Sequence, residues 1–261
     1  MHISFSKYQG AGNDFILIKD IGNSFPENDY ALIRELCDRR FGVGADGLIL
    51  LRDSKNKDFT MLYFNADGYE GTMCGNGGRC LVAFARDCGY ITKDKDICFD
   101  AIDGGHSAVI IRPGTISLKM KDVSCVRKMG SGYAVDTGST HHVEYVDKLV
   151  DMDVCGCGRA LREHEMYAPA GCNVNFIKVE NKNKIAIRTY ERGVEEETLA
   201  CGTGSVAAAI VHHALGYHYD QYVILARGGE LGVRFKNDGQ KYHDVWLDGP
   251  ATFVYKGEWK R

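Results

Sequence analysis

The chain repeats itself once, at a period close to half of its 261 residues. The motif Cys-Gly-Asn-Gly at 74–77 returns as Cys-Gly-Thr-Gly at 201–204, an offset of 127 positions. Three further pairs keep the same order at offsets of 126 to 128: Gly10–Phe15 with Gly138–Val143, Gly44–Asp46 with Gly171–Asn173, and Phe64–Gly68 with Tyr190–Gly193. Four pairs in one order indicate an internal duplication. The chain is therefore expected to fold as two similar halves.

Hydrophobic periodicity predicts the same kinds of element in both copies. Runs rich in apolar and β-branched residues predict strands at 15–18, 48–51, 60–64, 108–111 and 223–225. Each Cys-Gly-x-Gly motif opens a run that is apolar around most of a helical circumference, which is typical of a helix buried on all sides. These two helices are expected to end near Gly89 and Gly216. The prediction is an α+β fold of two pseudo-symmetric duplicated halves, each a curved strand layer around a buried central helix.

The boundary between the halves is expected at the Arg-Pro-Gly sequence of residues 112–114. This gives an N-terminal half, 1–113, which holds the first cysteine motif, and a C-terminal half, 114–249, which holds the second. The segment 250–261 follows Gly-Pro and is expected to return to the first half.

One more helix is predicted from Ser24 to Arg40. Pro26 suits its first turn, and Gly42 ends it. Its apolar face is formed by Leu32, Ile33, Leu36 and Cys37. Its basic residues, Arg34, Arg39 and Arg40, are expected to form a solvated helix end.

Composition and charge exclude several classes of protein. The 32 Lys and Arg residues nearly balance the 35 Asp and Glu residues, so no bulk positive field attracts nucleic acid or an anionic membrane. No apolar run approaches the ~18 residues of a membrane span, and the first seven residues lack the apolar core of a signal peptide. Ten cysteines favour a reducing compartment, and we expect a cytoplasmic protein. Their spacing lacks the paired pattern of zinc ligands, so no metal is expected.

The repeated cysteines suggest a particular chemistry. A thiol at the first turn of a helix lies near unpaired N–H groups and the positive end of the helix dipole, which favour a thiolate. The following glycines let a carboxylate approach the same N–H groups. If the halves pack about a pseudo-two-fold axis, Cys74 and Cys201 face one another. One thiolate and one thiol on opposite faces of an α-carbon can then invert it by removing and returning a proton.

These residues leave two kinds of function open. No lysine lies in a recognisable pyridoxal site, so the first is a cofactor-independent amino-acid racemase or epimerase, including the proline, hydroxyproline and histidine types. The second is a duplicated small-molecule binding protein whose thiols are incidental. Paired helix-end cysteines are unnecessary for binding alone, which favours the enzyme.

Five motifs together resemble those of the diaminopimelate epimerase family, and the resemblance runs from Gly10 to Pro250. The motifs lie at residues 12–15, 64–68, 73–80, 190–193 and 198–204. The resemblance implies interconversion of LL- and meso-diaminopimelate without a cofactor, in the synthesis of lysine and cell-wall precursors. It also implies two pseudo-symmetric α/β halves with a central helix in each.

The resemblance further implies roles for single residues. Cys74 and Cys201 are the acid and base, and Cys201 takes the proton from the LL isomer. His141 and Glu191 match positions that influence the pKa values of the cysteines. Contacts to substrate are implied for the side chains or backbone of Asn13, Asn65, Gly75, Asn76, Asn173, Glu191, Arg192, Gly202 and Thr203.

The chain departs from the usual pattern of the family at a few positions. Ser139 and Thr140 stand where Asn and Pro are usual, so a hydroxyl replaces one amide among the expected substrate contacts. Gly47 stands where some members carry Gln, and residues 194–197 are one residue longer than in many relatives. These departures concern recognition of the substrate rather than proton transfer.

The differences between the two copies of the repeat indicate which residues recognise the distal end of the substrate. Glu191 and Arg192 stand where the first copy has Asn65 and Ala66. An adjacent carboxylate and guanidinium suit a distal ammonium and carboxylate, which diaminopimelate has and proline lacks. The alternative is a structural ion pair between the two residues. The expected partner is a small amino-acid substrate, and a homodimer is kept open as the assembly.

Overall fold

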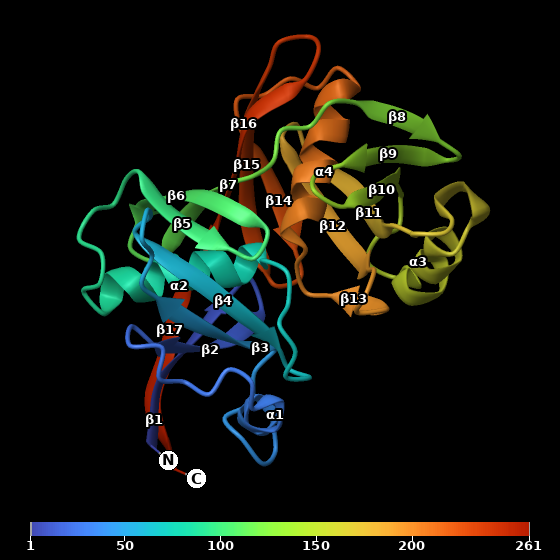
Figure 1. Ribbon diagram of the computed structural model, residues 1–261. Helices are drawn as coiled ribbons and strands as arrows, with labels where there is room; N and C mark the ends of the chain where they lie inside the picture. Colours follow the sequence, from blue (N-terminus) through green and yellow to red (C-terminus); the bar gives the residue numbers. More distant parts are fainter. Residues whose placement is uncertain (1, 261) are drawn as a thin grey trace. The chain divides into compact units, whose positions relative to one another are not determined.

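The computed structural model describes residues 2–260, and the chain divides into two compact units (Figure 1). The first half comprises Met1–Leu118 with Gly249–Arg261, and the second half comprises Lys119–Asp248. The boundary expected at 112–114 lies within the first half, in the turn between two antiparallel strands, β6 and β7.

In the first half, eight strands of the described chain follow the spatial order β17-β1-β2-β3-β4-β5-β6-β7. Two of the pairings are parallel, β2 with β3 and β4 with β5, and the others are antiparallel. Figure 1 shows β1 and β17 running side by side at the outer edge. The strands are β1 (His2–Gly10), β2 (Asn13–Lys19), β3 (Gly47–Arg52), β4 (Phe59–Asn65), β5 (Ile97–Ala101), β6 (Gly104–Arg112), β7 (Thr115–Lys119) and β17 (Thr252–Lys260).

The second half repeats this order and these directions. Its strands follow β8-β9-β10-β11-β12-β14-β15-β16, again with two parallel pairings, β10 with β11 and β12 with β14. A short strand, β13, adds to β12. The repetition confirms the predicted α+β fold with duplicated halves. The strands are β8 (Val126–Met129), β9 (Gly132–Asp136), β10 (Thr140–Tyr145), β11 (Asn173–Asn181), β12 (Lys184–Glu191), β13 (Glu196–Thr198), β14 (Tyr222–Ala226), β15 (Gly229–Asn237) and β16 (Tyr242–Pro250).

Each half encloses one helix. In the first half α2 (Gly75–Asp87) contacts β1, β2, β3, β4, β6 and β17. In the second half α4 (Gly202–Ala214) contacts seven strands of that half, from β8 to β12 and then β14 and β15. Ten consecutive residues of α2, 76–85, and nine of α4, 204–212, are buried. A helix can bury its whole circumference only where strands curve around it, so the prediction of buried central helices is confirmed.

The other face of each strand layer is covered by a shorter helix. In the first half α1 (Tyr30–Cys37) packs its buried residues against Leu48 and Leu50 of β3. The alternate residue Ile49 points to the opposite side, toward Gly77 of α2. A strand buried on both faces has no polar positions, which explains the continuous apolar run in β3. In the second half α3 (Val154–Arg162) takes the corresponding place, followed by a short 3₁₀ helix, η1 (Glu165–Tyr167).

The predicted helix from Ser24 to Arg40 is wrong at both ends, because three aspartates redirect the chain. Asp20 Oδ1 accepts hydrogen bonds from the backbone N–H groups of Ser24 and Phe25, which holds this segment in a turn. Asp29 caps α1 by accepting from the N–H of Leu32 at 2.9 Å. Side-chain acceptors of this kind compete with helical hydrogen bonds and favour turns and caps.

At the other end, Asp38 terminates the helix. Its backbone is extended, with φ −63° and ψ 126°, and its Oδ1 accepts from the N–H groups of Arg40 and Phe41 at 2.7 Å. The chain then loops back toward β2 and β3. As a result Arg39 lies outside the helix, and the prediction that it belongs to a solvated helix end is wrong.

In the part of the chain that the structure describes, no helix is long and apolar enough to cross a membrane.

Candidate active site

Cys74 lies at the N-terminal cap of α2. Its backbone is extended, with φ −94° and ψ 122°, and its carbonyl accepts the first helical hydrogen bond from Gly78 at 2.7 Å. A Cβ built on the next residue, Gly75, would have Leu118 Cδ2 as its nearest described neighbour, at 3.9 Å. The backbone of the first helical residue therefore has room beside it for a ligand. This is the arrangement in which N–H groups at a helix start can bind an anion.

The fourth residue of the motif, Gly77, has a different reason to be glycine. A Cβ on Gly77 would lie 2.9 Å from Ile49 Cδ1 and 3.4 Å from Met61 Cε. Its missing side chain lets α2 lie close against the strand layer. The motif thus combines one glycine whose Cβ would meet a single atom at ordinary contact distance with one whose Cβ would meet the core too closely.

Cys201 takes the same position at the N-terminal cap of α4. Its carbonyl accepts from both the N–H and the hydroxyl of Ser205, each at 2.9 Å. Its Sγ lies 3.4 Å from Thr203 Oγ1, and the residue is only 8% exposed. The backbone carbonyl of Thr203 accepts in turn from Thr137 Oγ1 at 3.1 Å. The first turn of α4 is therefore tied by this hydroxyl to the residue that follows β9.

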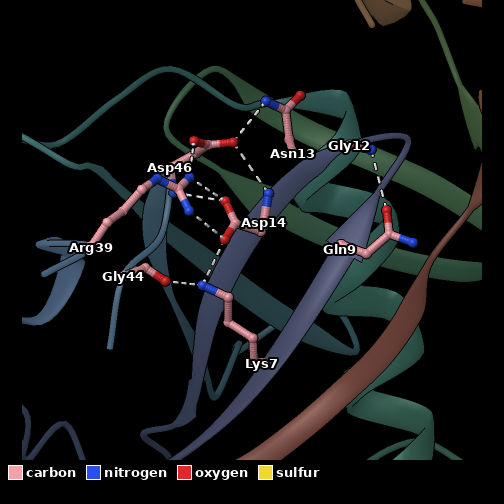
Figure 2. Close-up of polar contacts among 8 residues, drawn as sticks. All are labelled: Lys7, Gln9, Gly12, Asn13, Asp14, Arg39, Gly44 and Asp46. Atoms are coloured by element: carbon pink, nitrogen blue, oxygen red, sulfur yellow. Dashed lines mark hydrogen bonds and ion pairs between the residues drawn. The ribbon is translucent and has the colours of Figure 1, made fainter. Parts of the chain in front are cut away.

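In the first half, Asn13 lies next to the start of α2. A two-residue turn precedes it, in which Ala11 and Gly12 both have positive φ, as tight hairpins between twisted strands require. Its Oδ1 accepts from Asn76 Nδ2 at 2.6 Å, and its Nδ2 donates to Asp46 Oδ2 at 3.0 Å (Figure 2). The structure therefore brings Asn13 and Asn76 into direct contact.

Asn65 lies at the end of β4 and is exposed. The turn that follows closes through a hydrogen bond from Gly68 N to Asn65 O at 3.0 Å. Gly68 has φ +93°, the same value as Gly193 at the equivalent turn of the second half. Gly47, one of the departures from the family pattern, lies beside this strand. A Cβ there would lie 2.5 Å from the carbonyl oxygen of Phe64, so this backbone accepts only glycine.

In the second half, Asn173 joins three of the predicted residues. Its Nδ2 donates to Ser139 Oγ at 3.2 Å, and its Oδ1 accepts from the backbone N–H of Arg192 at 2.9 Å. Ser139 Oγ also lies 3.0 Å from His141 Nε2. The hydroxyl that replaces the usual amide is thus part of an internal network.

His141 is completely buried and neutral. Burial, followed by the charge of Arg192, lowers its pKa to about 3. Asn175 Nδ2 donates to His141 Nδ1 at 3.0 Å, and its Oδ1 accepts from Thr189 Oγ1, which sets the direction of this amide. The imidazole hydrogen is therefore assigned to Nε2, where Ser139 Oγ accepts it. His141 can influence its surroundings as a neutral dipole, not as a cation.

Glu191 is the last residue of β12, Arg192 follows it, and both are partly buried. Burial raises the pKa of Glu191, and a hydrogen bond from Thr198 Oγ1 at 3.0 Å acts in the opposite direction. Arg192 Nη1 donates to the carbonyl oxygens of Ala170 and Gly171 at 3.1 and 3.3 Å. Within residues 2–260 the two side chains form no ion pair with each other. This disfavours the alternative in which they are a structural pair.

Sequence reasoning missed the residues that support these groups. In the first half Asp46 holds Asn13 and is itself linked to Arg39, Asp14 and Lys7, and in the second half Asn175 holds His141. The repeat offered one signal, because it aligns Asp46 with Asn173. Among the described residues no group of three or more His, Cys, Asp or Glu side chains could hold a metal ion.

Comparison with known proteins agrees with the repeated fold. The phenazine biosynthesis protein of the PhzF family from Bacillus anthracis superimposes with a TM-score of 0.76 over 100% of both chains, at 15% identity. At that identity the likeness concerns the fold alone. The chain is thus a duplicated α+β protein with a cysteine at the start of each central helix.

Sequence comparison identifies the family within this class. The model of the family described as Diaminopimelate epimerase matches residues 5–122 and 133–254. The diaminopimelate epimerase of Flavobacterium psychrophilum is 48% identical, over 96% of this chain and 97% of its own length. That of Chlorobaculum tepidum is 42% identical, over 95% and 98%. The chain belongs to the diaminopimelate epimerase family, and it is an epimerase.

Proposed function

We propose that the protein interconverts LL- and meso-diaminopimelate by proton transfer between two thiols, Cys74 and Cys201, in the synthesis of lysine and cell-wall precursors. The observation that carries the proposal is the repeated cap position. Both cysteines precede the first residue of a buried central helix, at corresponding points of the two halves. The identity of the substrate is inferred from family membership, because the relatives compared above are named diaminopimelate epimerases.

The proposed reaction starts with Cys201 as a thiolate and Cys74 as a thiol. Cys201 Sγ removes the α-hydrogen of the LL isomer as a proton, and the electron pair of the broken C–H bond passes into the carboxylate. Cys74 Sγ–H then gives its proton to the opposite face of the carbon. Cys201 ends as the thiol and Cys74 as the thiolate, and the reverse reaction starts from that state.

The charge that develops on the carboxylate needs donors. We assign this role to the backbone N–H groups of Gly75, Asn76, Gly202 and Thr203, in the first turns of the two helices. Fixed donors aimed at developing charge lower the barrier without reorganisation. The room beside Gly75 supports this assignment.

The second amino-acid head of the substrate is assigned to the second half. Arg192 suits a carboxylate and Glu191 suits an ammonium, and neither charge is neutralised by the other within the described chain. Asn173 supports the assignment because it holds the backbone of Arg192 in place. Ser139 contributes through Asn173.

The test is isotope exchange without added cofactor. The protein is incubated with LL-diaminopimelate in deuterium oxide, and the product is analysed by mass spectrometry and chiral chromatography. Appearance of the meso isomer with deuterium at one α-carbon supports the proposal. Exchange only into proline, hydroxyproline or histidine would point to a different racemase, and no exchange with any of them would contradict a racemase function.

A further inference from the structure

A cluster of four charged side chains lies beside Asn13 in the first half (Figure 2). Lys7 Nζ lies 2.8 Å from Asp14 Oδ2. Arg39 binds both oxygens of Asp14, at 3.0 and 2.6 Å, and its Nη2 also lies 2.6 Å from Asp46 Oδ1. The guanidinium of Arg39 thereby joins the two carboxylates, and Lys7 adds the second cation through Asp14.

The cluster is anchored in the core. Lys7 is 5% exposed, and its ammonium also donates to the carbonyl oxygen of Gly44. A buried charge persists only where it is paired and hydrogen-bonded. Burial acts to raise the pKa of Asp14, but hydrogen bonds from Arg39 and Lys7 lower it to about 2. Asp14 therefore remains ionised in neutral solution and holds Arg39 in place.

The cluster also determines which way two amides point. A carboxylate only accepts hydrogen bonds, so Asp46 Oδ2 takes the Nδ2 side of Asn13 at 3.0 Å. The Oδ1 of Asn13 then faces Asn76 Nδ2 at 2.6 Å. The Oδ1 of Asn76 faces Arg79 Nη2, again at 2.6 Å. Both amides are aligned between an anion at one end and a cation at the other.

This chain of contacts ends at the first turn of α2. Arg79 is completely buried, and its Nη1 lies 3.4 Å from the carbonyl oxygen of Gly75, the residue after Cys74. An amide nitrogen carries two hydrogens, and Asp46 takes only one from Asn13. Among residues 2–260 the second hydrogen has no partner, so a ligand acceptor can take it.

We propose that Asp46, held by Arg39, is a positioning residue that makes Asn13 present an N–H to the substrate. The inference rests on the proposed function, in which Asn13 contacts the substrate. It assigns Asn13 to an oxygen acceptor of the substrate rather than to its ammonium groups. Asp46 itself acts only through Asn13.

The sharpest variant is Asp46→Asn, which removes little volume and one charge. Arg39 requires an acceptor, so the new amide turns its oxygen to Arg39 and its nitrogen to Asn13. Two donors then face each other, and the alignment of Asn13 is lost. Losing a hydrogen bond to a charged group predicts a fall in kcat/KM of about tenfold to a hundredfold. The matched control is Asp87→Asn, which removes a carboxylate that accepts from Tyr8 at 2.6 Å in the same half.

The decisive comparison is a double-mutant cycle with Asn13→Ala. If Asp46 acts through Asn13, then Asp46→Asn changes kcat/KM by less than about twofold once Asn13 is absent. If the two effects multiply, or if Asp46→Asn matches the Asp87→Asn control, the proposal is wrong.

A measurement without substrate separates this inference from the proposed function. The side-chain amide signals of Asn13 are identified by NMR from their loss in Asn13→Ala. We expect one Nδ2 proton to be shifted by its bond to Asp46, and Asp46→Asn to remove that shift. If these NMR signals are observed but the wild-type protein does not epimerise diaminopimelate, the proposed function is wrong and the positioning role stands. Unchanged signals in Asp46→Asn would overturn the positioning role, and Arg39→Gln, at a half-exposed side chain, repeats the test if Asp46→Asn does not fold.

Discussion

The two halves support equivalent positions of the repeat with different chemistry. In the first half Asn13 is held by a carboxylate, Asp46, which is tied to a guanidinium. In the second half the equivalent positions carry His141 and Asn173, and both are held by neutral hydrogen bonds.

The difference shows how a duplicated fold can divide its tasks. In the first half the charged groups beside Asn13, which are Lys7, Asp14, Arg39 and Asp46, neutralise one another. In the second half the side chains of Glu191 and Arg192 form no ion pair with each other, within the part of the chain described. The first half therefore uses charge for internal support, whereas the proposed function assigns recognition of a zwitterionic ligand to the second half.

The largest effect is expected from removing either sulfur. These variants test whether both halves are required for proton transfer. A positioned acid or base contributes about 10²–10⁴-fold, so Cys74→Ala and Cys201→Ala should each lower the epimerisation rate by at least about 10²-fold. Cys74→Ala retains the proposed base for the LL isomer and should wash deuterium into that isomer without inverting it. Cys201→Ala should do so only from the meso isomer. Substantial and equal epimerisation by either variant would show that one base suffices.

The next effect tests whether charge recognition belongs to the second half. Arg192→Ala should weaken diaminopimelate binding by about 2–5 kcal/mol, because a desolvated carboxylate loses its partner. The change should appear mainly in KM, measured by steady-state kinetics. Arg227→Ala removes a half-exposed arginine of the same half that pairs with Glu197 at 3.0 Å, and it serves as the control. Wild-type KM and kcat in Arg192→Ala would remove the argument for a distal zwitterion.

The third prediction compares one repeat position in both halves. In Gly204→Ala the new Cβ would lie 2.3 Å from Asn175 Oδ1, a buried atom held by Thr189. In Gly77→Ala it would meet Ile49 Cδ1 at 2.9 Å, the end of a flexible side chain. Overpacking should cost Gly204→Ala about 1–3 kcal/mol of unfolding free energy.

Gly77→Ala should lose less unfolding free energy, because the flexible end of Ile49 can move aside. The gain from alanine in a helix, about 1 kcal/mol, is the same in both variants and does not affect the comparison. Urea unfolding of both variants measures the difference. Equal losses of unfolding free energy in the two variants would contradict this prediction.

The smallest effect concerns acid stability and is specific to the second half. The pKa of His141 is lowered from 6.5 to about 3 in the folded protein, chiefly by burial. Between these values the unfolded chain binds a proton that the folded protein does not, so stability falls as the pH falls through this range. His141 contributes a slope of up to about 1.4 kcal/mol per pH unit.

Denaturation at several pH values checks this slope. His141→Gln should reduce it between pH 6.5 and pH 5. Asn13→Ala changes the equivalent residue of the first half, which cannot titrate, and should leave the slope as it is. An unchanged slope in His141→Gln would mean that the imidazole is protonated in the folded protein.

The repeat at offsets of 126 to 128, together with the local pattern in each copy, was enough to predict the duplicated fold. The Cys-Gly-x-Gly motifs and the apolar runs after them depend on residues close in the chain, and both central helices follow directly from them. The ends of α1 could not be predicted in the same way. Asp20, Asp29 and Asp38 each bind nearby N–H groups, and apolar periodicity does not record that competition.

The candidate site was predictable where a residue belongs to a motif and not where it acts from a distance. Asn13, Asn76 and Asn173 lie in or beside motifs. Arg39 reaches Asp14 only because the loop after α1 returns to β2, across 25 positions of the chain. The parallel pairing of β2 with β3 brings Asp46 to Asn13 in the same way.

The position of β17 has a consequence for how the protein is made. Residues 119–248 form the whole second half, and they are inserted between the two segments of the first half. On the ribosome the second half is therefore complete in sequence before β17 has been synthesised. The outer pairing of β1 joins His2 to Lys260, so β1 must wait for almost the entire chain before its edge is covered. During synthesis the first segment exposes an unpaired strand edge, and the inserted half can reach its native pairing first.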